Sequence, residues 1–164
     1  MVEISTASPA DLDGITALLH ANSPSQGGAL TGEFSRDKVA QMAGSGAPVV
    51  VAHRDGLVVG VLFSSAKDNP DSPPSVRAML TAWPGQPSAY VYGPVCIAES
   101  ERGRGLLPKL VAALQAHYPG REAVLFIRSD NLASLHAHQR LGMHKVADFM
   151  LDGLGYIVLS DFVP

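Results

Sequence analysis

Residues 95–114 read VCIAESERGRGLLPKLVAAL, and their character changes twice within this stretch. The opening apolar run predicts the end of a β-strand. Aliphatic residues then recur at helical spacing and predict one face of a helix, at positions Leu106, Leu107, Leu110, Val111 and Leu114. The basic, glycine-rich segment between them, residues 102–105, therefore joins a strand to the first turn of a helix.

This junction has the features of an anion site. Gly103 and Gly105 let the backbone turn tightly and approach a ligand closely. The first helical turn leaves amide N–H groups unpaired, and the helix dipole adds positive potential there. Arg102 and Arg104 add charge beside it. The plain alternative is a basic connection that binds nothing.

Two better-known phosphate motifs do not fit the junction. No Gly-Lys-Ser/Thr follows it, so it is not a Walker loop. Gly103 and Gly105 give Gly-x-Gly, but Pro108 stands where a dinucleotide fingerprint has its third glycine. The sequence therefore predicts a pyrophosphate or phosphate site of another type.

Apolar alternation and turn signals predict seven strands, over residues 2–6, 48–53, 57–64, 88–98, 123–128, 143–151 and 154–162. Helical spacing and caps predict helices after Ser8, from Ser35 to Ala43, over 76–83, after Gly105, and after the caps at 129–131, the last one ended by Gly142 at a C-cap position. Strands interleaved with helices indicate an α/β or α+β layer fold. The length of 164 residues suits one domain spanning 1–164.

Two features interrupt this regular pattern. Residues 67–87 form an insertion with a proline-rich start and a short amphipathic helix, which predicts a functional loop or lid. Pro94 lies inside the strand predicted over 88–98. Because proline donates no ladder hydrogen bond, it predicts a bulge or a splayed edge there.

Composition excludes several classes of protein. Hydrophobic residues make up 46% and charged residues 16% of the chain, which is a globular composition. The net charge of -3 gives no basic excess for binding nucleic acid or an anionic membrane. Cys96 is the single cysteine, so no disulfide framework is expected. Without an apolar run of bilayer length or a basic, apolar N-terminal leader, we predict a soluble, cytoplasmic protein.

Residues 131–143 read NLASLHAHQRLGM and form a second notable segment. At about 100° per residue, Asn131, Ser134 and His138 fall on one face of a helix. His136 falls nearly opposite. We therefore expect His138 to face what Asn131 faces, and His136 to point away.

Together the two segments resemble the GNAT acetyltransferases. The acetyl-CoA motif of that family is usually written Arg/Gln-x-x-Gly-x-Gly/Ala, and Arg102 and Gly105 match it, whereas Leu107 stands where Gly or Ala is usual. The second motif is Asn-x-x-Ala/Ser-x-x-x-Tyr/His-x-x-x-Gly-Phe. It is matched by Asn131, Ser134, His138 and Gly142, with Met143 in place of phenylalanine.

The resemblance implies a mixed central sheet of about seven strands with helices on both faces. It implies an N-acetyltransferase that uses acetyl-CoA as co-substrate and moves the acetyl group to a primary amine by direct attack in a ternary complex. It also implies the cofactor contacts, namely Val95, Cys96 and Ile97 along the pantetheine arm, Arg102, Gly103, Arg104, Gly105, Leu106 and Leu107 at the pyrophosphate, and Asn131, Ser134 and His138.

His138 occupies the position of the family's usual tyrosine acid. Our hypothesis is that it protonates the leaving thiolate, and the alternative is that it packs or binds the cofactor. Tyr92, on the central strand near the predicted splay, is the second catalytic candidate. No base stands out, and we expect Glu99 and Glu101 to be solvated loop carboxylates.

Other chemistry is less favoured by the residues present. Cys96 lacks an adjacent base in the sequence, so a small buried thiol is expected rather than an acyl-enzyme nucleophile. His136 and His138 diverge on a helix, so no metal site is predicted.

The acceptor is predicted to be a small-molecule amine or an amino acid, because the chain has no strong acidic cluster for a polycationic acceptor. Met79, Trp83 and Tyr156 are candidate walls of its site, and core packing explains Met79 and Trp83 equally well. A protein N-terminus or lysine side chain is the alternative acceptor, and a non-catalytic acyl-CoA sensor is the alternative function. The resemblance also leaves room for a homodimer.

Overall fold

The structure, a computed structural model, describes residues 1–164 and divides into two compact units. Unit 1 comprises Met1–Ser64 and Gly93–Pro119, and unit 2 comprises Ser65–Tyr92 and Gly120–Pro164. Strand β4 (Tyr90–Ile97) contributes residues to both. The seven strands form a mixed sheet in the order β1-β2-β3-β4-β5-β7-β6, which confirms the predicted fold class. The single-domain organisation stays a prediction.

Unit 1 is built on an antiparallel meander. Strand β1 (Val2–Thr6) pairs with β2 (Val50–Arg54), which pairs with β3 (Leu57–Ala66). The β2–β3 turn places Asp55 and Gly56 at φ 52° and 78°. Both angles are positive, as a type I′ hairpin turn requires, so the turn signal at Asp55-Gly56 correctly predicted this hairpin.

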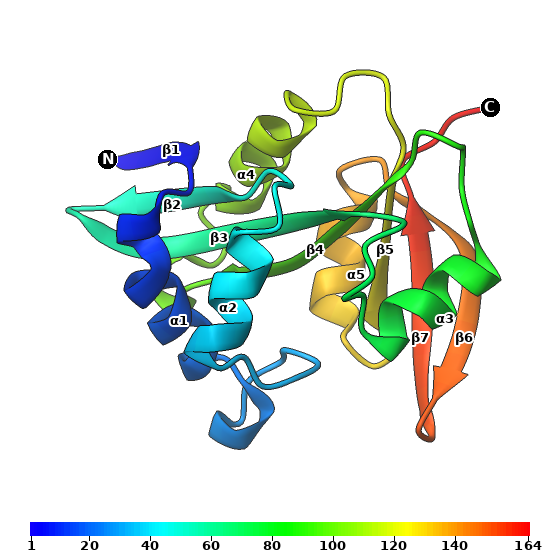
Figure 1. Ribbon diagram of the computed structural model, residues 1–164, viewed down its shortest axis with the longest axis horizontal. Coiled ribbons are helices and arrows are strands. Elements are labelled where there is room, and N and C mark those ends of the chain that lie inside the picture. Colours follow the sequence, from blue (N-terminus) through cyan, green and yellow to red (C-terminus); the bar gives the residue numbers. More distant parts are fainter. The chain divides into compact units, whose positions relative to one another are not determined.

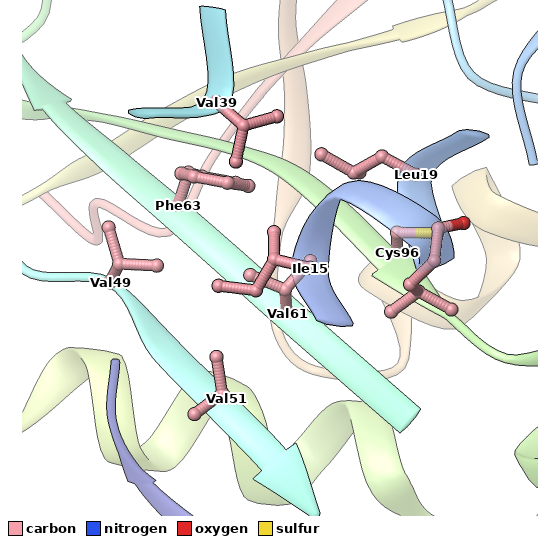
Figure 2. Packing of buried hydrophobic residues seen from close by; sticks show 9 residues of the cluster. Ile15, Leu19, Val39, Val49, Val51, Val61, Phe63 and Cys96 are labelled. Carbon is pink, nitrogen blue, oxygen red and sulfur yellow. The ribbon is translucent and has the colours of Figure 1, made fainter. Parts of the chain in front are cut away.

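Two helices cover one face of this meander. A 3₁₀ turn (Pro9–Asp11), capped by Ser8, leads into α1 (Leu12–Ala21), and α2 (Arg36–Ala43) begins after Ser35, whose hydroxyl accepts the Lys38 N–H. Figures 1 and 2 show both helices packed over the strands. Their contacts bury the cluster of Ile15, Leu18, Leu19, Val39, Val49, Val51, Val61, Phe63 and Cys96.

Helix α4 (Leu106–Gln115) covers the opposite face of unit 1. Gly60 of β3 permits this close packing, because a Cβ atom there would lie 3.2 Å from the side chains of both Leu106 and Leu110. The buried residues of α4 are those of the predicted apolar face, apart from half-buried Leu107: Leu106, Leu110, Val111 and Leu114. Unit 1 thus has helices on both faces, as expected.

Unit 2 contains the other half of the sheet. Strand β5 (Ala123–Arg128) runs parallel to β4 and antiparallel to β7 (Leu154–Ser160), and β7 pairs with the edge strand β6 (His144–Leu151). The Gly93–Pro94 peptide bond of β4 is cis. The predicted splay near Pro94 stays a prediction.

Helices also cover both faces of the sheet in unit 2. Helix α3 (Pro74–Ala82) packs Val76 and Met79 against the face that Val91 occupies. Neighbouring side chains of a strand point to opposite faces, and Tyr92 meets His138 of α5 (Leu132–Gln139). Helix α5 therefore lies over the face opposite α3.

The 67–87 insertion contributes α3 to the core of unit 2. Met79 is fully buried, so it lines no acceptor surface, and its alternative role in core packing is confirmed. The chain after α3 is fixed by the buried Glu122 carboxylate, which accepts hydrogen bonds from Trp83 Nε1 (3.0 Å), the Gln86 N–H (2.6 Å) and the Ser160 hydroxyl. A lid role for the segment stays a prediction.

Helix α5 is closed by Gly142, as the sequence indicated. Its last regular residue is Gln139, and Gly142 follows with φ 88°, in the left-handed region. The Gly142 N–H donates to the Gln139 carbonyl oxygen and the Met143 N–H donates to that of His138. This is the hydrogen-bond pattern of a glycine-terminated helix, so the predicted C-cap is confirmed.

None of the helices is long and apolar enough to cross a lipid bilayer.

Candidate active site

The candidate residues fall into two groups, one in each unit. Unit 1 holds Val95–Ile97 of β4 and the glycine loop, residues 102–105, with the start of α4. Unit 2 holds Tyr92, Asn131, Ser134 and His138. Each group has a geometry of its own.

The glycine loop is open and needs its glycines. Gly103 and Gly105 have φ values of 75° and 78°, in the left-handed region that side chains with a Cβ atom rarely adopt. A Cβ atom built at either position would meet no atom within 4 Å. The backbone is therefore accessible to a ligand at close range, as predicted.

Helix α4 starts directly at this loop, with Gly105 as its N-cap residue. The N–H groups of its first turn have no partner within the helix, and no acidic residue lies in that turn. Arg104 is exposed beside it. A ten-residue helix with free N–H groups, a positive dipole end and adjacent guanidinium groups can hold a diphosphate.

Arg102 has a more specific environment than the sequence indicated. Its Nη2 donates to Asn22 Oδ1 at 2.5 Å, and its Nε donates to the Ile97 carbonyl oxygen at 3.4 Å. The side chain is exposed, so an anion at the helix start could compete for it. Arg102 thus links the loop to the end of α1 in this structure.

Cys96 is a buried thiol, as the sequence favoured. Its side chain belongs to the core of unit 1, and Sγ lies 3.9 Å from the Leu18 carbonyl oxygen. Burial raises the pKa of Cys96 to about 11, although the nearby Arg102 charge opposes this. A thiol that stays protonated is a poor nucleophile, so Cys96 is unsuited to forming an acyl-enzyme.

Tyr92 and His138 form the central contact of the second group. The Tyr92 hydroxyl lies 2.8 Å from His138 Nε2, and the rings meet edge to face with centroids 5.5 Å apart. Their exposed fractions are 5% and 2%. His136, on the same helix, is exposed, so the predicted division of the two histidines is confirmed.

The hydrogen-bond partners of His138 fix the position of its proton. Nδ1 lies 2.8 Å from the Ser134 carbonyl oxygen, which can only accept, so Nδ1 carries a hydrogen. Nε2 of the neutral ring then holds a lone pair, and Tyr92 donates to it. Burial lowers the pKa of His138 and raises the pKa of Tyr92, so both groups are neutral near pH 7.

Asn131 and Ser134 complete this group. The Asn131 side-chain oxygen accepts the Ser134 N–H at 3.2 Å and so caps α5. The Ser134 hydroxyl lies 3.4 Å from His138 Nδ1. These contacts hold His138 in one orientation toward Tyr92. Cofactor contacts of Asn131 and Ser134 stay predictions.

The buried state of His138 predicts a pH dependence of stability. Its folded pKa lies below the unfolded value of about 6.5, so the unfolded chain binds a proton that the folded chain resists. The free energy of unfolding should therefore fall as the pH drops below about 6.5, by at most about 1.4 kcal/mol per pH unit for this proton.

Urea unfolding between pH 5 and 8 measures this slope. His138→Gln should flatten it, whereas His136→Gln, at the exposed position of the same helix, should keep the wild-type slope. Equal slopes in wild type and His138→Gln would contradict the assignment of a neutral His138.

Glu101 was predicted to be a solvated loop carboxylate, and this prediction is wrong. It is 4% exposed, and its carboxylate accepts two hydrogen bonds from Arg54, at 2.7 and 2.9 Å. Glu99 is exposed, as predicted. The sequence carried no local sign of the pair, because its members are 47 residues apart.

No group of three or more His, Cys, Asp or Glu side chains is placed to hold a metal ion.

Comparison with known proteins supports this picture. A model of the acetyltransferase (GNAT) family matches residues 16–143. The chain shares its fold with yncA from Salmonella typhimurium, solved with its cofactor acetyl-CoA, at TM-score 0.73 and 22% identity over 98% of this chain and 92% of that one.

Two further solved structures have the same fold. A GNAT superfamily phosphinothricin acetyltransferase from Sinorhizobium meliloti, in complex with acetyl-CoA, gives TM-score 0.71 at 19% identity over 97% and 86% of the two chains. The ribosomal-protein-S18-alanine N-acetyltransferase from Escherichia coli gives TM-score 0.71 at 14% identity, over 98% of this chain and 92% of that one. No curated protein sequence matches the chain.

The family match covers well over half of the chain and includes both segments in which the motifs were found, the glycine loop before α4 and the helix that carries His138. The protein therefore belongs to the acetyltransferase (GNAT) family, and so to the acyltransferases.

Proposed function

We propose that the protein is an N-acetyltransferase that moves the acetyl group of acetyl-CoA to a primary amine by direct attack in a ternary complex. The observation that carries this proposal is the open glycine loop at the start of α4, with free N–H groups and exposed Arg102 and Arg104 beside it. Solved relatives of the same fold contain acetyl-CoA, which supports it.

The cofactor proposal predicts that the double variant Arg102→Ala, Arg104→Ala binds acetyl-CoA about ten- to a hundredfold more weakly than wild type. Two charge-assisted contacts to the diphosphate are lost in this variant. Calorimetric titration of acetyl-CoA measures this. Arg36→Ala, Lys38→Ala removes two exposed cations from α2 of the same unit and serves as the control. Equal weakening in both variants would reduce the effect to net charge, and no binding by wild type would remove the proposal.

Direct attack is favoured over an acyl-enzyme because Cys96 is buried and protonated. In direct attack, the amine nitrogen forms a bond to the thioester carbon, and the carbon–sulfur bond then breaks. Proximity of the two bound reactants supplies much of the rate. By the family resemblance, the β4 backbone at Val95–Ile97 pairs with the pantetheine arm, and its N–H groups polarise the carbonyl.

The reaction needs one proton to leave the amine and one to reach the thiolate. We propose that Tyr92 and His138 act as a unit, which takes up the amine proton and then delivers a proton to the thiolate. The Tyr92 oxygen takes the amine proton while its own hydrogen passes to His138 Nε2, and the reverse transfer protonates the sulfur. The 2.8 Å hydrogen bond supports this route, and the Ser134 carbonyl oxygen stabilises the transient imidazolium.

The lowered pKa of His138 suits this role. Burial makes the imidazolium unfavourable, so His138 holds the proton briefly and returns it readily. One pair of residues therefore serves as both base and acid. At the end of the reaction, Tyr92 and His138 are in the protonation states in which they began. The sequence-based role of His138 as acid is retained as the second half of this cycle.

We further propose a small-molecule amine or an amino acid as acceptor. The absence of a strong acidic cluster in the sequence supports this choice over a polycationic acceptor. Relatives of the same fold are named for both phosphinothricin and a ribosomal protein. The test measures release of the CoA thiol with a panel of small amines and amino acids, and with peptides that have free N-termini. It shows which of the two classes of acceptor is used. Turnover with peptides alone would overturn the small-acceptor proposal.

The same assay addresses the sensor alternative, since a sensor binds acetyl-CoA without releasing CoA to any amine. A cytoplasmic location and a homodimer stay predictions.

A further inference from the structure

A partly buried ion pair adjoins the glycine loop, with Glu101 buried and the Arg54 side chain 34% exposed. Glu101 ends the 3₁₀ turn Glu99–Glu101 and directly precedes Arg102. Its Oε2 accepts from Arg54 Nε at 2.7 Å, and its Oε1 accepts from Arg54 Nη2 at 2.9 Å. Arg54 is the last residue of β2, so the pair connects the β2–β3 hairpin to the turn before the loop.

The geometry makes Glu101 unsuitable as a catalytic base. Both carboxylate oxygens are engaged by one guanidinium group, and the residue is 4% exposed. The hydrogen bonds from Arg54 lower the pKa of Glu101, against the effect of burial. Glu101 is therefore a charged group that is fixed in place and fully neutralised by Arg54.

Two consequences follow for the loop. An unpaired carboxylate one residue before Arg102 would repel an anion at the start of α4, because like charges a few ångströms apart repel each other even near a protein surface. The pair also anchors the turn itself, in which the Glu101 N–H donates to the Ala98 carbonyl oxygen at 2.9 Å and the Arg102 N–H to that of Glu99 at 3.2 Å.

We infer that Arg54 and Glu101 are positioning residues for the CoA diphosphate. Arg54 does not supply charge to the ligand but cancels that of Glu101, and the pair holds the loop in its open conformation. This inference rests on the proposed function, since it takes the glycine loop as the site of the diphosphate.

The test compares two acetyl donors. Arg54→Ala should raise the Kd and the KM for acetyl-CoA at least tenfold, while kcat at saturating acetyl-CoA stays within about threefold of wild type. Acetyl-pantetheine carries the same thioester but no diphosphate, so its kcat/KM should be almost unchanged. A merely structural role would impair both donors alike.

Three further variants complete the design. Arg54→Ala, Glu101→Gln removes the unpaired charge and should recover part of the affinity for acetyl-CoA. Arg54→Lys keeps the charge but loses the two-pronged contact, so its Kd for acetyl-CoA should lie between those of wild type and Arg54→Ala. If the alanine variant fails to fold, Arg54→Lys alone tests the inference, and its Kd should exceed that of wild type. Arg36→Ala removes an exposed arginine that pairs with Asp13 in the same unit, and should change neither donor.

The outcomes separate the inference from the proposed function. Failure of wild type to bind acetyl-CoA would sink the proposed function. Normal wild-type binding, with Arg54→Ala and Arg54→Lys changing both donors equally or neither, would overturn the positioning role and leave the proposed function standing.

Discussion

Tyr92→Phe is expected to lower kcat by about a hundredfold or more, with little change in the KM for acetyl-CoA. The substitution keeps the ring and removes the hydroxyl that bonds to His138 Nε2 at 2.8 Å. General acid–base groups typically contribute 10²- to 10⁴-fold, and the proposed proton exchange passes through this oxygen. Steady-state release of CoA, with the best amine of the acceptor panel, measures the effect.

The matched control is Tyr118→Phe, because Tyr118 is also buried and its hydroxyl lies 2.8 Å from the Ser64 hydroxyl in unit 1. Both substitutions should lower stability by about 1 kcal/mol, and Tyr118→Phe should retain kcat. His138→Gln should show a loss similar to that of Tyr92→Phe. The double variant should lose little more than either single one, since the two residues act as a unit. Full turnover by Tyr92→Phe would eliminate the proton exchange.

Glu122→Ala should give the largest loss of stability, about 3 kcal/mol in the free energy of unfolding. The carboxylate accepts hydrogen bonds from Trp83, Gln86 and Ser160. Burial alone would raise the pKa of Glu122, but these bonds lower it, so the group is ionised. Removing it leaves three donors without an acceptor, and an unsatisfied buried donor costs about 1–3 kcal/mol. Urea unfolding at pH 7 provides the measurement.

Two variants sharpen this result. Glu99→Ala removes an exposed carboxylate and should change stability by less than about 0.5 kcal/mol. Glu122→Gln keeps one acceptor oxygen and should lie between wild type and Glu122→Ala. A loss below 1 kcal/mol in Glu122→Ala would show that the chain after α3 does not depend on this anchor.

Local signals in the sequence were sufficient for most of the fold. The strands at residues 2–6 and 123–128 have the predicted bounds, and helix α2 begins after Ser35 and ends before Gly44 as expected. These elements are set by alternation, caps and Asp-Gly turns, all of which act within a few residues. The end of α5 was predicted as well, because Gly142 has the left-handed conformation, with φ 88°, that glycine readily adopts after a helix.

The candidate site was predictable to a lesser extent. Helical spacing placed His138 and His136 on opposite sides of α5, and burial confirms this. Spacing could not show that Tyr92 lies beneath His138, or that Arg54 neutralises Glu101, because these partners are 46 and 47 residues apart. Periodicity indicates which face of an element is buried, but not which other element covers it.

The absence of a side chain at Gly60 also bears on how the protein could be stabilised by substitution. An alanine Cβ there would press on Leu106, the first residue of α4, and on Leu110 one turn later. Filling sheet glycines is a common route to more stable variants. In this protein the same edit requires the Leu106 and Leu110 side chains to shift by a few tenths of an ångström, beside the helix start whose N–H groups are proposed to meet the diphosphate. Libraries designed for heat resistance should therefore screen substitutions at residue 60 for acetyl-CoA affinity as well as for thermal tolerance.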